Sequence, residues 1–467
     1  MEFAFNDAKL WSFIIQMGVL AAIMLLANVM RRKIPFIRKM LMPTAVLAGF
    51  IALILRVIGI IKLDNSQLEI VTYHTIAIGF IALSLIIPNR ERNFSKAFVG
   101  SKTGALIVSY YLLQGVIGLV ISIGLAYTIR PDMFKAAGIL LAMGFGQGPG
   151  QANNVGLTYE ALGFRGGQSF GLSIAAMGFL VACSVGVLCL NIFKSKGLVR
   201  KDAGKGVGPA QESSTLDEYE DKNEIPISES VDRFSIQVAL VLAVYLITWL
   251  LLTGVTKLLV SVNEGAAQTL LPVLWGFNFL FGALLAVAFR GLIRTFRNVG
   301  WMTRQYQNNY LLSRISGYSF DLMIVTGICT INFEKLSGLW LPFILMCTFG
   351  TIFTLLYIKW ICTKLYPDYY YEAFLSLFGM STGVISSGML LLREVDPKYQ
   401  TPAATNLLLG SSFAIGFAFP LLILIGLAPK SDLMSIIVLG CCIVYFFLLL
   451  GYMLLVKQKK QPEQRKV

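Results

Sequence analysis

The stretch Gly-Phe-Gly-Gln-Gly-Pro-Gly-Gln at residues 144–151 ends an aliphatic run that begins after Pro131-Asp132. A similar run follows Pro367-Asp368 and ends in Gly-Met-Ser-Thr-Gly at residues 379–383. Both runs are too short to cross a bilayer, which takes about 20 apolar residues. Their glycines and polar residues leave backbone groups unpaired, which a membrane tolerates only inside protein or beside water. We therefore predict two re-entrant hairpins, hairpin one near 133–155 and hairpin two near 370–394.

The composition is that of a membrane protein. The chain has 467 residues, of which 56% are hydrophobic and 14% charged, and its mean hydropathy is +0.72. Its net charge of +14 sits at the ends of apolar runs, which indicates headgroup contacts and topology rather than nucleic-acid binding. The seven cysteines lie in or beside apolar runs without a CxxC pair, so neither disulfides nor a zinc site are expected.

The apolar runs predict an all-α polytopic protein with eleven spans and no cleavable signal peptide. The predicted spans are 10–30, 40–61, 68–88, 104–128, 168–193, 234–260, 267–289, 309–332, 338–362, 403–426 and 431–456. Each hairpin precedes the last of five spans in its half of the chain. The eleventh span has no counterpart in the first half.

Basic residues alternate between the two sides of these spans. The richer side carries Arg31, Arg32, Lys33, Arg38, Lys39, Arg90, Arg92, Arg290, Arg294, Arg297 and the tail Lys457–Lys466. By the positive-inside rule that side is cytoplasmic, which places the N-terminus outside and the C-terminus inside. Because five crossings is an odd number, the second half starts on the opposite side. The pattern therefore predicts two inverted repeats whose hairpins enter from opposite faces.

The domain organisation follows from the same pattern. We predict an N-terminal repeat at 1–193, an inverted C-terminal repeat at 234–426, and an added span with a basic tail at 427–467. Residues 194–233 change from basic to acidic and hold few apolar side chains. Such a segment cannot bury a core, so it is predicted to be a flexible cytoplasmic linker.

The tip of hairpin one combines glycines with carboxamides. Glycines allow close backbone approach to a ligand, and carboxamides offer donors and acceptors without the cost of a buried charge. Starts of half-helices suit a carboxylate, and unwound carbonyls suit Na⁺. The alternative is a polar extracellular loop. The candidate binding residues are Gly144, Gly146, Gln147, Gly148, Gln151, Asn153 and Asn154.

The tip of hairpin two offers hydroxyls instead. The candidates are Ser381, Thr382, Gly383, Ser386 and Ser387. Their hydroxyls suit a carboxylate or a cation, and Ser386 or Ser387 is expected to cap the following half-helix. The alternative is a face of small residues for close helix packing.

Ionisable residues inside apolar runs form a third group. Arg314 and Asp321 are seven positions apart, which places them on one helix face. A carboxylate in such a run is costly, so Asp321 is a candidate ion ligand or proton carrier, and Asp321 and Arg314 are the candidate coupling residues. The alternative is a structural ion pair or a polar contact between helices. His74, the only histidine, is interpreted as a packing residue. One histidine and scattered cysteines exclude a conventional metal cluster.

At its two tips the chain resembles the bacterial sodium/glutamate symporter family. The resemblance also rests on span order, on residues 336–342 followed by 351–353, and on Tyr-Tyr-Glu-Ala at 370–373. The first tip differs, because the family has a Gly-Gly-His-Gly-like core there. The resemblance implies two inverted five-span halves, Na⁺-driven uptake of glutamate, and a homodimer in the bacterial inner membrane.

The predicted function is therefore alternating-access symport of glutamate or a related carboxylate with Na⁺, without a further cofactor. The alternatives are an ion channel and a proton-coupled transporter of another small solute. A channel filter would carry rings of carbonyls or charges, which neither tip shows. An enzyme is not expected, because Asp321, His74 and Glu160 are too scattered for a catalytic set. The sequence also lacks a Walker loop and a nucleophile elbow.

Overall fold

The computed structural model describes residues 8–87, 94–198, 233–262, 271, 274–302, 305–396 and 400–456. Every extended regular element in these ranges is a helix. Among them, nine helices are long and apolar enough to cross a membrane. The prediction of an all-α polytopic membrane protein is thus confirmed at this level. Most of the linker predicted at 194–233, and the tail from residue 457, lie outside the described residues.

Two of the eleven predicted spans correspond to helices that are too short or not apolar enough to be among these nine. The helix in the 40–61 region, α3 (Thr44–Val57), has only 14 residues. The helix in the 309–332 region, α12 (Asn309–Cys329), has 21 residues but includes Arg314 and Asp321. The predicted span 267–289 starts too early, because α11 runs over Asn278–Asn298 and includes three arginines. α11 also continues beyond the predicted end at residue 289, because arginine stems can lie along apolar surface while their heads reach the interface.

The chain divides into two compact units, each built from both halves of the sequence. Unit 1 comprises Met1–Asn89, Pro149–Ala176 and Val207–Ser337, and unit 2 comprises Arg90–Gly148, Met177–Gly206 and Gly338–Val467. Unit 1 thus takes the first three predicted spans of each half. Unit 2 takes the fourth span of the first half, the last two predicted spans of the second half, the eleventh span and all of hairpin two, while the fifth span is divided between the units after Ala176. The boundary Gly148–Pro149 lies in the tip of hairpin one.

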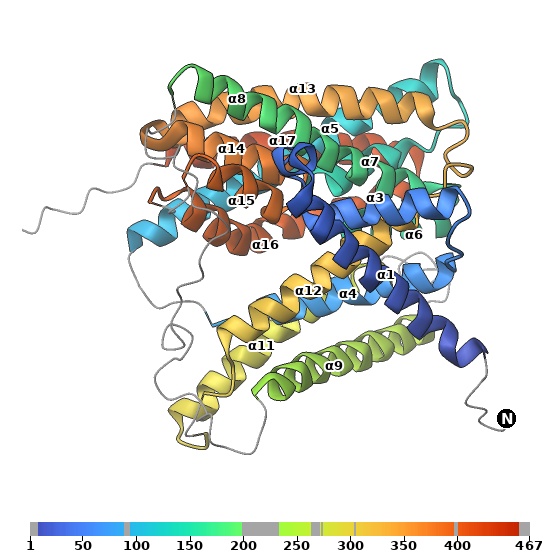
Figure 1. Cartoon of the computed structure of the whole chain (residues 1–467), viewed down its shortest axis with the longest axis vertical. Helices are drawn as coiled ribbons and strands as arrows, with labels where there is room; N and C mark the ends of the chain where they lie inside the picture. Colours follow the sequence, from blue (N-terminus) through green and yellow to red (C-terminus); the bar gives the residue numbers. More distant parts are fainter. Residues whose placement is uncertain are drawn as a thin grey trace, which may run out of the picture. The chain divides into compact units, whose positions relative to one another are not determined.

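In unit 1, α4 is the central helix (Figure 1) and contacts α6, α9, α11 and α12. The helices are α1 (Ala8–Lys33), α2 (Pro35–Lys39), α3, α4 (Asn65–Leu85), α6 (Pro149–Ala161), α9 (Arg233–Val262), α11 and α12, with the start of α7 (Gly167–Val181). One core cluster joins four of them through Leu85, Val244, Ala286 and Leu312. Burying such side chains contributes about 1.5–3 kcal/mol each when the alternative is water.

Polar side chains close the C-terminal end of α4. Arg290 Nη1 donates to the carbonyls of Ser84 and Ile86, at 2.9 and 2.7 Å. Asn309 exchanges two hydrogen bonds with the backbone of Ile87, at 2.8 and 2.9 Å. The last carbonyls of a helix have no partner within the helix, and a cation there also suits the helix dipole. These contacts hold the end of α4 against α11 and α12.

Unit 2 is built around α5 (Phe94–Thr128), which contacts α13, α14, α16, α17 and the first arm of hairpin one. The other helices are η1 (Lys135–Ile139), η2 (Ala142–Gly146), η3 (Ala182–Gly186), α8 (Val187–Ser195), α13 (Trp340–Leu365), η6 (Pro367–Tyr369), α14 (Tyr370–Thr382), α15 (Ile385–Arg393), α16 (Ala403–Leu427), η7 (Ala428–Lys430) and α17 (Asp432–Leu455). The elements η1, η6 and η7 are 3₁₀ turns, and η2 and η3 are π-helical.

The first arm of hairpin one lies directly on α5. A Cβ added to Gly118 would overlap the backbone of Gly138, and one added to Gly138 would overlap that of Gly118. The backbones touch because neither residue has a side chain. Ser122 Oγ donates to the carbonyl of Lys135 at 2.6 Å and accepts from the amide of Gly138 at 3.2 Å. Ser122 thereby satisfies backbone groups in the 3₁₀ arm, which an apolar interior requires.

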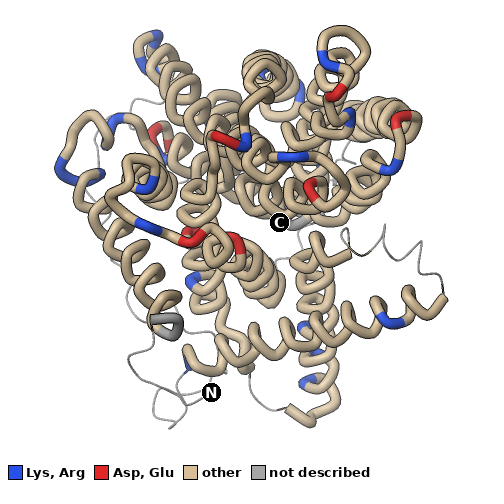
Figure 2. The backbone as a smooth tube through the Cα atoms, turned by 90° about the vertical axis from the view of Figure 1, so that its right-hand side faces the viewer, with Lys and Arg blue, Asp and Glu red and all other residues tan. Residues whose placement is uncertain are grey.

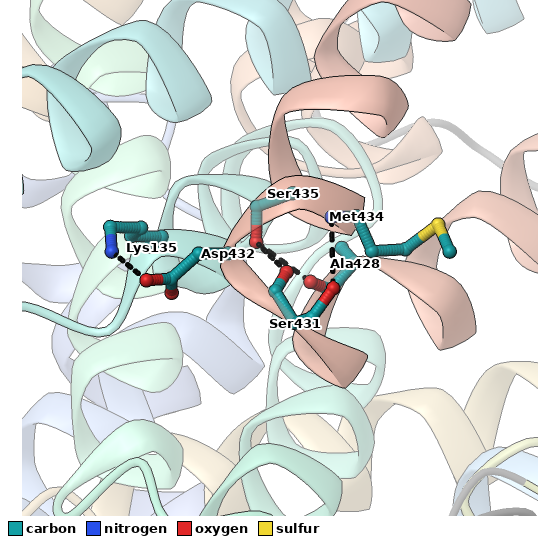
Figure 3. Close-up of polar contacts among 6 residues, drawn as sticks. All are labelled: Lys135, Ala428, Ser431, Asp432, Met434 and Ser435. Atoms are coloured by element: carbon teal, nitrogen blue, oxygen red, sulfur yellow. Dashed lines mark hydrogen bonds and ion pairs between the residues drawn. The ribbon is translucent and has the colours of Figure 1, made fainter.

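The charged residues at the root of hairpin one are paired (Figure 3). Lys135 Nζ contacts Asp432 at the start of α17 and lies 4.8 Å from the ring centre of Tyr127. Ser431 caps α17 by accepting from the amide of Met434 at 3.1 Å. Arg130 lies 3.3 Å from Asp132 and holds the pKa of that exposed carboxyl below its usual range. The added eleventh helix is therefore part of unit 2 and meets hairpin one.

Charges are sparse along the helices. Figure 2 shows long tan stretches of helix between the blue and red positions. All seven cysteines are described, and all are free thiols, five of them buried. This agrees with the predicted absence of disulfides.

Candidate functional site

Hairpin one breaks at the predicted glycine-rich tip. Its first arm passes from the 3₁₀ turn η1 into the π-helix η2 and ends at Gly146. The backbone then turns at Gly148, whose φ of +88° lies in the left-handed region that favours glycine. The second arm, α6, starts at Pro149 with its fixed φ. Gly144, Gly146 and Gly148 are buried, and Gln147 is half-buried.

Hairpin two breaks between Thr382 and Ile385. The α14 arm ends with Gly383 and Val384 in non-helical conformations, and α15 follows. The prediction that Ser386 or Ser387 caps α15 is wrong. The N-cap is Val384, which makes no side-chain cap, and both serines lie inside the first turn of α15. Ser386 is exposed and Ser387 is buried, so the prediction missed the cap by two or three residues.

The tips of both hairpins meet in unit 2. A Cβ added to Gly148 would lie 2.7 Å from Val384 Cγ1 and 4.0 Å from the carbonyl oxygen of Gly383. Next to them, a Cβ on Gly178 of α7 would lie 3.1 Å from Phe145 Cδ1 and also overlap the Thr382 carbonyl. The two breaks, far apart in the sequence, thus lie side by side among small residues.

Gln114 is a polar residue at this meeting point that sequence reasoning missed. It lies near the middle of α5 and is fully buried. Gln114 Nε2 donates to the carbonyl of Ser381 at 2.8 Å and to Thr354 Oγ1 of α13 at 3.1 Å. Its Oε1 accepts from no donor in the described part of the chain. A single carboxamide within the apolar run 104–128 was a usable signal, because such groups are costly in a membrane.

The hydroxyls of hairpin two have different environments. Ser381 and Thr382 donate to the carbonyl of Phe378 in their own helix, at 3.0 and 2.9 Å. Ser387 Oγ is buried and has no partner among the residues described. Gly383 lies close to it, since a Cβ there would lie 2.7 Å from Ser387 Oγ. Among the buried hydroxyls described at this tip, Ser387 is therefore the one that is not engaged by its own helix.

Unit 1 holds the carboxamides of hairpin one in a hydrogen-bonded chain. Gln168 Nε2 of α7 donates to Asn153 Oδ1 at 2.9 Å, and Asn153 Nδ2 donates to Asn154 Oδ1 at 3.3 Å. The chain ends at Asn154 Nδ2, a buried donor without a partner in the described ranges. One turn earlier on α6, Gln151 Oε1 is an acceptor in the same situation. The α6 arm thus presents one free donor and one free acceptor.

Gln168 was also missed from the sequence. Its backbone amide donates to Glu160 Oε1 at 3.3 Å, and its side chain interacts with the Glu69 carboxylate of α4. The backbone amide and the side chain of Gln168 therefore both have partners, and the side chain in turn orients Asn153. Its position at the start of a span gave no hint of this role, because the pairing depends on how α4, α6 and α7 pack.

Asp321 and Arg314 do not pair, although both lie on one exposed face of α12. Arg314 lies over the ring of Tyr310, 4.9 Å from its centre. The ion pairs recorded within the described residues do not include Asp321. An ion pair between Asp321 and Arg314 is thus not formed, and a coupling role for these two residues stays a prediction.

His74 takes part in a polar contact between helices of unit 1. Its Nδ1 lies 2.6 Å from the hydroxyl of Tyr245 on α9, and Asn278 Nδ2 of α11 donates to the same hydroxyl at 3.3 Å. The imidazole also meets the rings of Tyr73 and Tyr245 edge to face. These contacts agree with the interpretation of His74 as a packing residue.

A search of the described residues finds no group of three or more His, Cys, Asp and Glu side chains that could hold a metal ion. The tips instead offer neutral oxygen and amide groups. Such groups can bind a monovalent cation or a carboxylate.

No protein-family model matches the chain, and no curated protein shows significant similarity to it.

Proposed function

We propose that the chain is a secondary active transporter that takes up glutamate or a related carboxylate together with Na⁺. The observation that carries the proposal is the meeting of two broken helices in unit 2, with Gly148 beside Val384. Secondary transporters build substrate and ion sites from discontinuous helices of this kind. Buried polar atoms near the breaks have no partner among the described residues, and a bound ligand would provide one.

In this proposal the α6 arm recognises the carboxylate. Asn154 Nδ2 is a buried donor, and the chain from Gln168 through Asn153 fixes its orientation. The start of α6 adds the partial positive charge of a helix N-terminus. An anion there gains a buried donor that has no partner among the described residues.

Alternating access requires two bodies that move, and the chain divides into two compact units. Each half of the sequence contributes its first three spans to unit 1 and its fourth span to unit 2. We further propose that the two halves are inverted repeats and that the protein is a homodimer in the inner membrane, with its N-terminus outside. Hydroxyls and carbonyls of both hairpin tips would then bind Na⁺.

Uptake of radiolabelled glutamate into proteoliposomes tests the proposal. We expect uptake to follow an inward Na⁺ gradient and to stop when an ionophore collapses it. A panel of unlabelled mono- and dicarboxylates, added as competitors, identifies the substrate. Empty liposomes and an Asn154→Leu variant serve as controls.

Uptake driven by a proton gradient without Na⁺ would show that the coupling ion is H⁺ and not Na⁺. Currents far above transporter turnover would favour the channel. No uptake of any carboxylate under either gradient would remove the proposal.

A further inference from the structure

We infer that Gln114 is a ligand of the coupling cation, bound through its Oε1 atom in unit 2. This inference rests on the proposed function, because it names the place where that cation is held. It adds a residue outside both hairpins to the binding machinery.

The orientation of the Gln114 carboxamide is determined by its partners. The carbonyl of Ser381 can only accept, so the atom that lies 2.8 Å from it must be the Nε2 donor. Thr354 Oγ1 takes a second bond from Nε2 at 3.1 Å. Oε1 therefore points the other way, in a fully buried site, and meets no donor among the described side chains and amides.

The unpaired oxygen faces the end of the first arm of hairpin one. A Cβ added to Gly146 would lie 2.8 Å from Gln114 Oε1. Gly146 is the last residue of η2, and Ser381, which Gln114 also contacts, is in the last turn of α14. Two helix C-termini thus meet at one carboxamide. Helix C-termini carry partial negative charge, so all three features favour a cation.

The type of cation follows from the ligands. Divalent ions are held mostly by carboxylates. No cluster of acidic, histidine or cysteine side chains suited to such an ion exists in the residues described. Neutral oxygens from a carboxamide and from helix ends suit a monovalent ion, which is less strongly hydrated than a divalent one. The coupling ion of the proposed transporter is such an ion.

A cation at this point would act on both hairpins. Gln114 already holds the tip of hairpin two through Ser381 and faces the tip of hairpin one at Gly146. A bound ion would draw both helix ends towards the same oxygen and so order both tips. Ordered tips would bind substrate more tightly, and by linkage bound substrate would raise cation affinity equally.

Gln114→Leu tests the inference, because leucine keeps the volume and removes the oxygen. We measure the Na⁺ concentration for half-maximal uptake, the substrate KM at saturating Na⁺, and the shift in Tm that Na⁺ alone causes in purified protein. Gln114→Leu is expected to raise the half-maximal Na⁺ concentration about tenfold or more. The substrate KM at saturating Na⁺ should change much less, and the Na⁺-dependent Tm shift should disappear.

Ser109→Ala is the matched control. Ser109 is also a buried polar residue of α5, and it bonds the Tyr357 hydroxyl of α13 at 2.6 Å, much as Gln114 bonds Thr354. Its Na⁺ dependence should equal that of the wild type. Thr354→Val removes one partner of Nε2 but keeps Oε1, so it should shift Na⁺ dependence less than about threefold.

If Gln114→Leu does not fold, Gln114→Asn is used instead, because it keeps a carboxamide but shortens the side chain by one methylene and so moves the oxygen away from the site. A Na⁺ dependence unchanged in either folded variant overturns the inference and leaves the proposed function intact. A change in substrate KM alone overturns it in favour of substrate binding at Gln114. A wild-type protein that ignores Na⁺ in both uptake and Tm removes the proposed function together with the inference.

Discussion

Hairpin one and hairpin two break at similar tips but are supported in different ways. Hairpin one enters through a 3₁₀ turn and a π-helix, and its backbone needs α5 for packing at Gly118 and for hydrogen bonds from Ser122. Hairpin two enters through α14, a regular helix of 13 residues that satisfies its own backbone. A broken helix in a membrane must find partners for its polar groups, and these hairpins find them in different places.

The polar groups that the hairpins present also differ. Hairpin one presents a carboxamide donor and acceptor, Asn154 Nδ2 and Gln151 Oε1, while hairpin two presents the hydroxyl of Ser387. The donor of Asn154 is aligned by two further amides, whereas no hydrogen bond to a described residue orients Ser387 Oγ. We therefore expect hairpin one to be sensitive to substitution in both stability and affinity, and hairpin two to be more tolerant.

The largest effect is expected for Gly118→Ala. Its Cβ would overlap the backbone of Gly138, which cannot rotate away, so we expect a loss of at least about 3 kcal/mol or failure to fold. The Tm in detergent and the yield of monodisperse protein measure it. Gly124→Ala is the control on the same helix, since nothing lies within 4 Å of its Cβ and alanine favours a helix. Equal Tm values for both variants would contradict the close contact between hairpin one and α5.

The second effect concerns affinity. Asn154→Asp replaces the buried donor with a charged acceptor, so we expect the KM for a carboxylate substrate to rise about tenfold to a hundredfold. Uptake kinetics at saturating Na⁺ measure the change. Gln168→Leu, which frees Asn153 without touching Asn154, should raise KM by a smaller factor. An unchanged KM in Asn154→Asp would mean that the carboxylate binds elsewhere.

The third effect separates the backbone support of the hairpins. Ser122→Ala leaves the Lys135 carbonyl and the Gly138 amide without the hydroxyl, so we expect a loss of about 1–3 kcal/mol. Chemical or thermal unfolding in detergent measures it. Ser184→Ala is the control, because its exposed hydroxyl bonds only the carbonyl of Leu180 in the helix that carries it. Similar stability in both variants would show that the 3₁₀ arm does not depend on α5 for hydrogen bonds.

The smallest effect is expected for Ser387→Ala. Ser387 Oγ gives up no hydrogen bond to any described group, so stability should change by less than about 0.5 kcal/mol. Uptake should change less than about threefold. A large rise in KM, with stability kept, would place the substrate on hairpin two and reverse the contrast between the hairpins.

The sequence predicted the two breaks because helix termination is local. Glycine and proline within residues 144–151, and Gly383 after α14, disfavour continued helix. The same locality misled the prediction at Ser386 and Ser387, which lie inside α15 rather than before it. Hydropathy placed the start of α11 several residues too early. Repeat inversion and membrane side stay predictions, since they depend on a bilayer.

Only some residues of the candidate site could be predicted from the sequence. Asn154 and Gln151 were named from composition, but their unpaired atoms follow from partners on other helices. Gln114 and Gln168 were not named, although both carry the contacts that orient the site.

The amino-acid sequence alone determined that this is a helical membrane protein broken at two glycine-rich points, because hydropathy and helix propensity depend on neighbours along the chain. Tertiary structure alone decided that Gly148 meets Val384, and that Gln114 Oε1 is left without a donor from any described residue. Whether a buried polar atom is paired depends on helices distant in sequence, and that pairing is settled only when they pack.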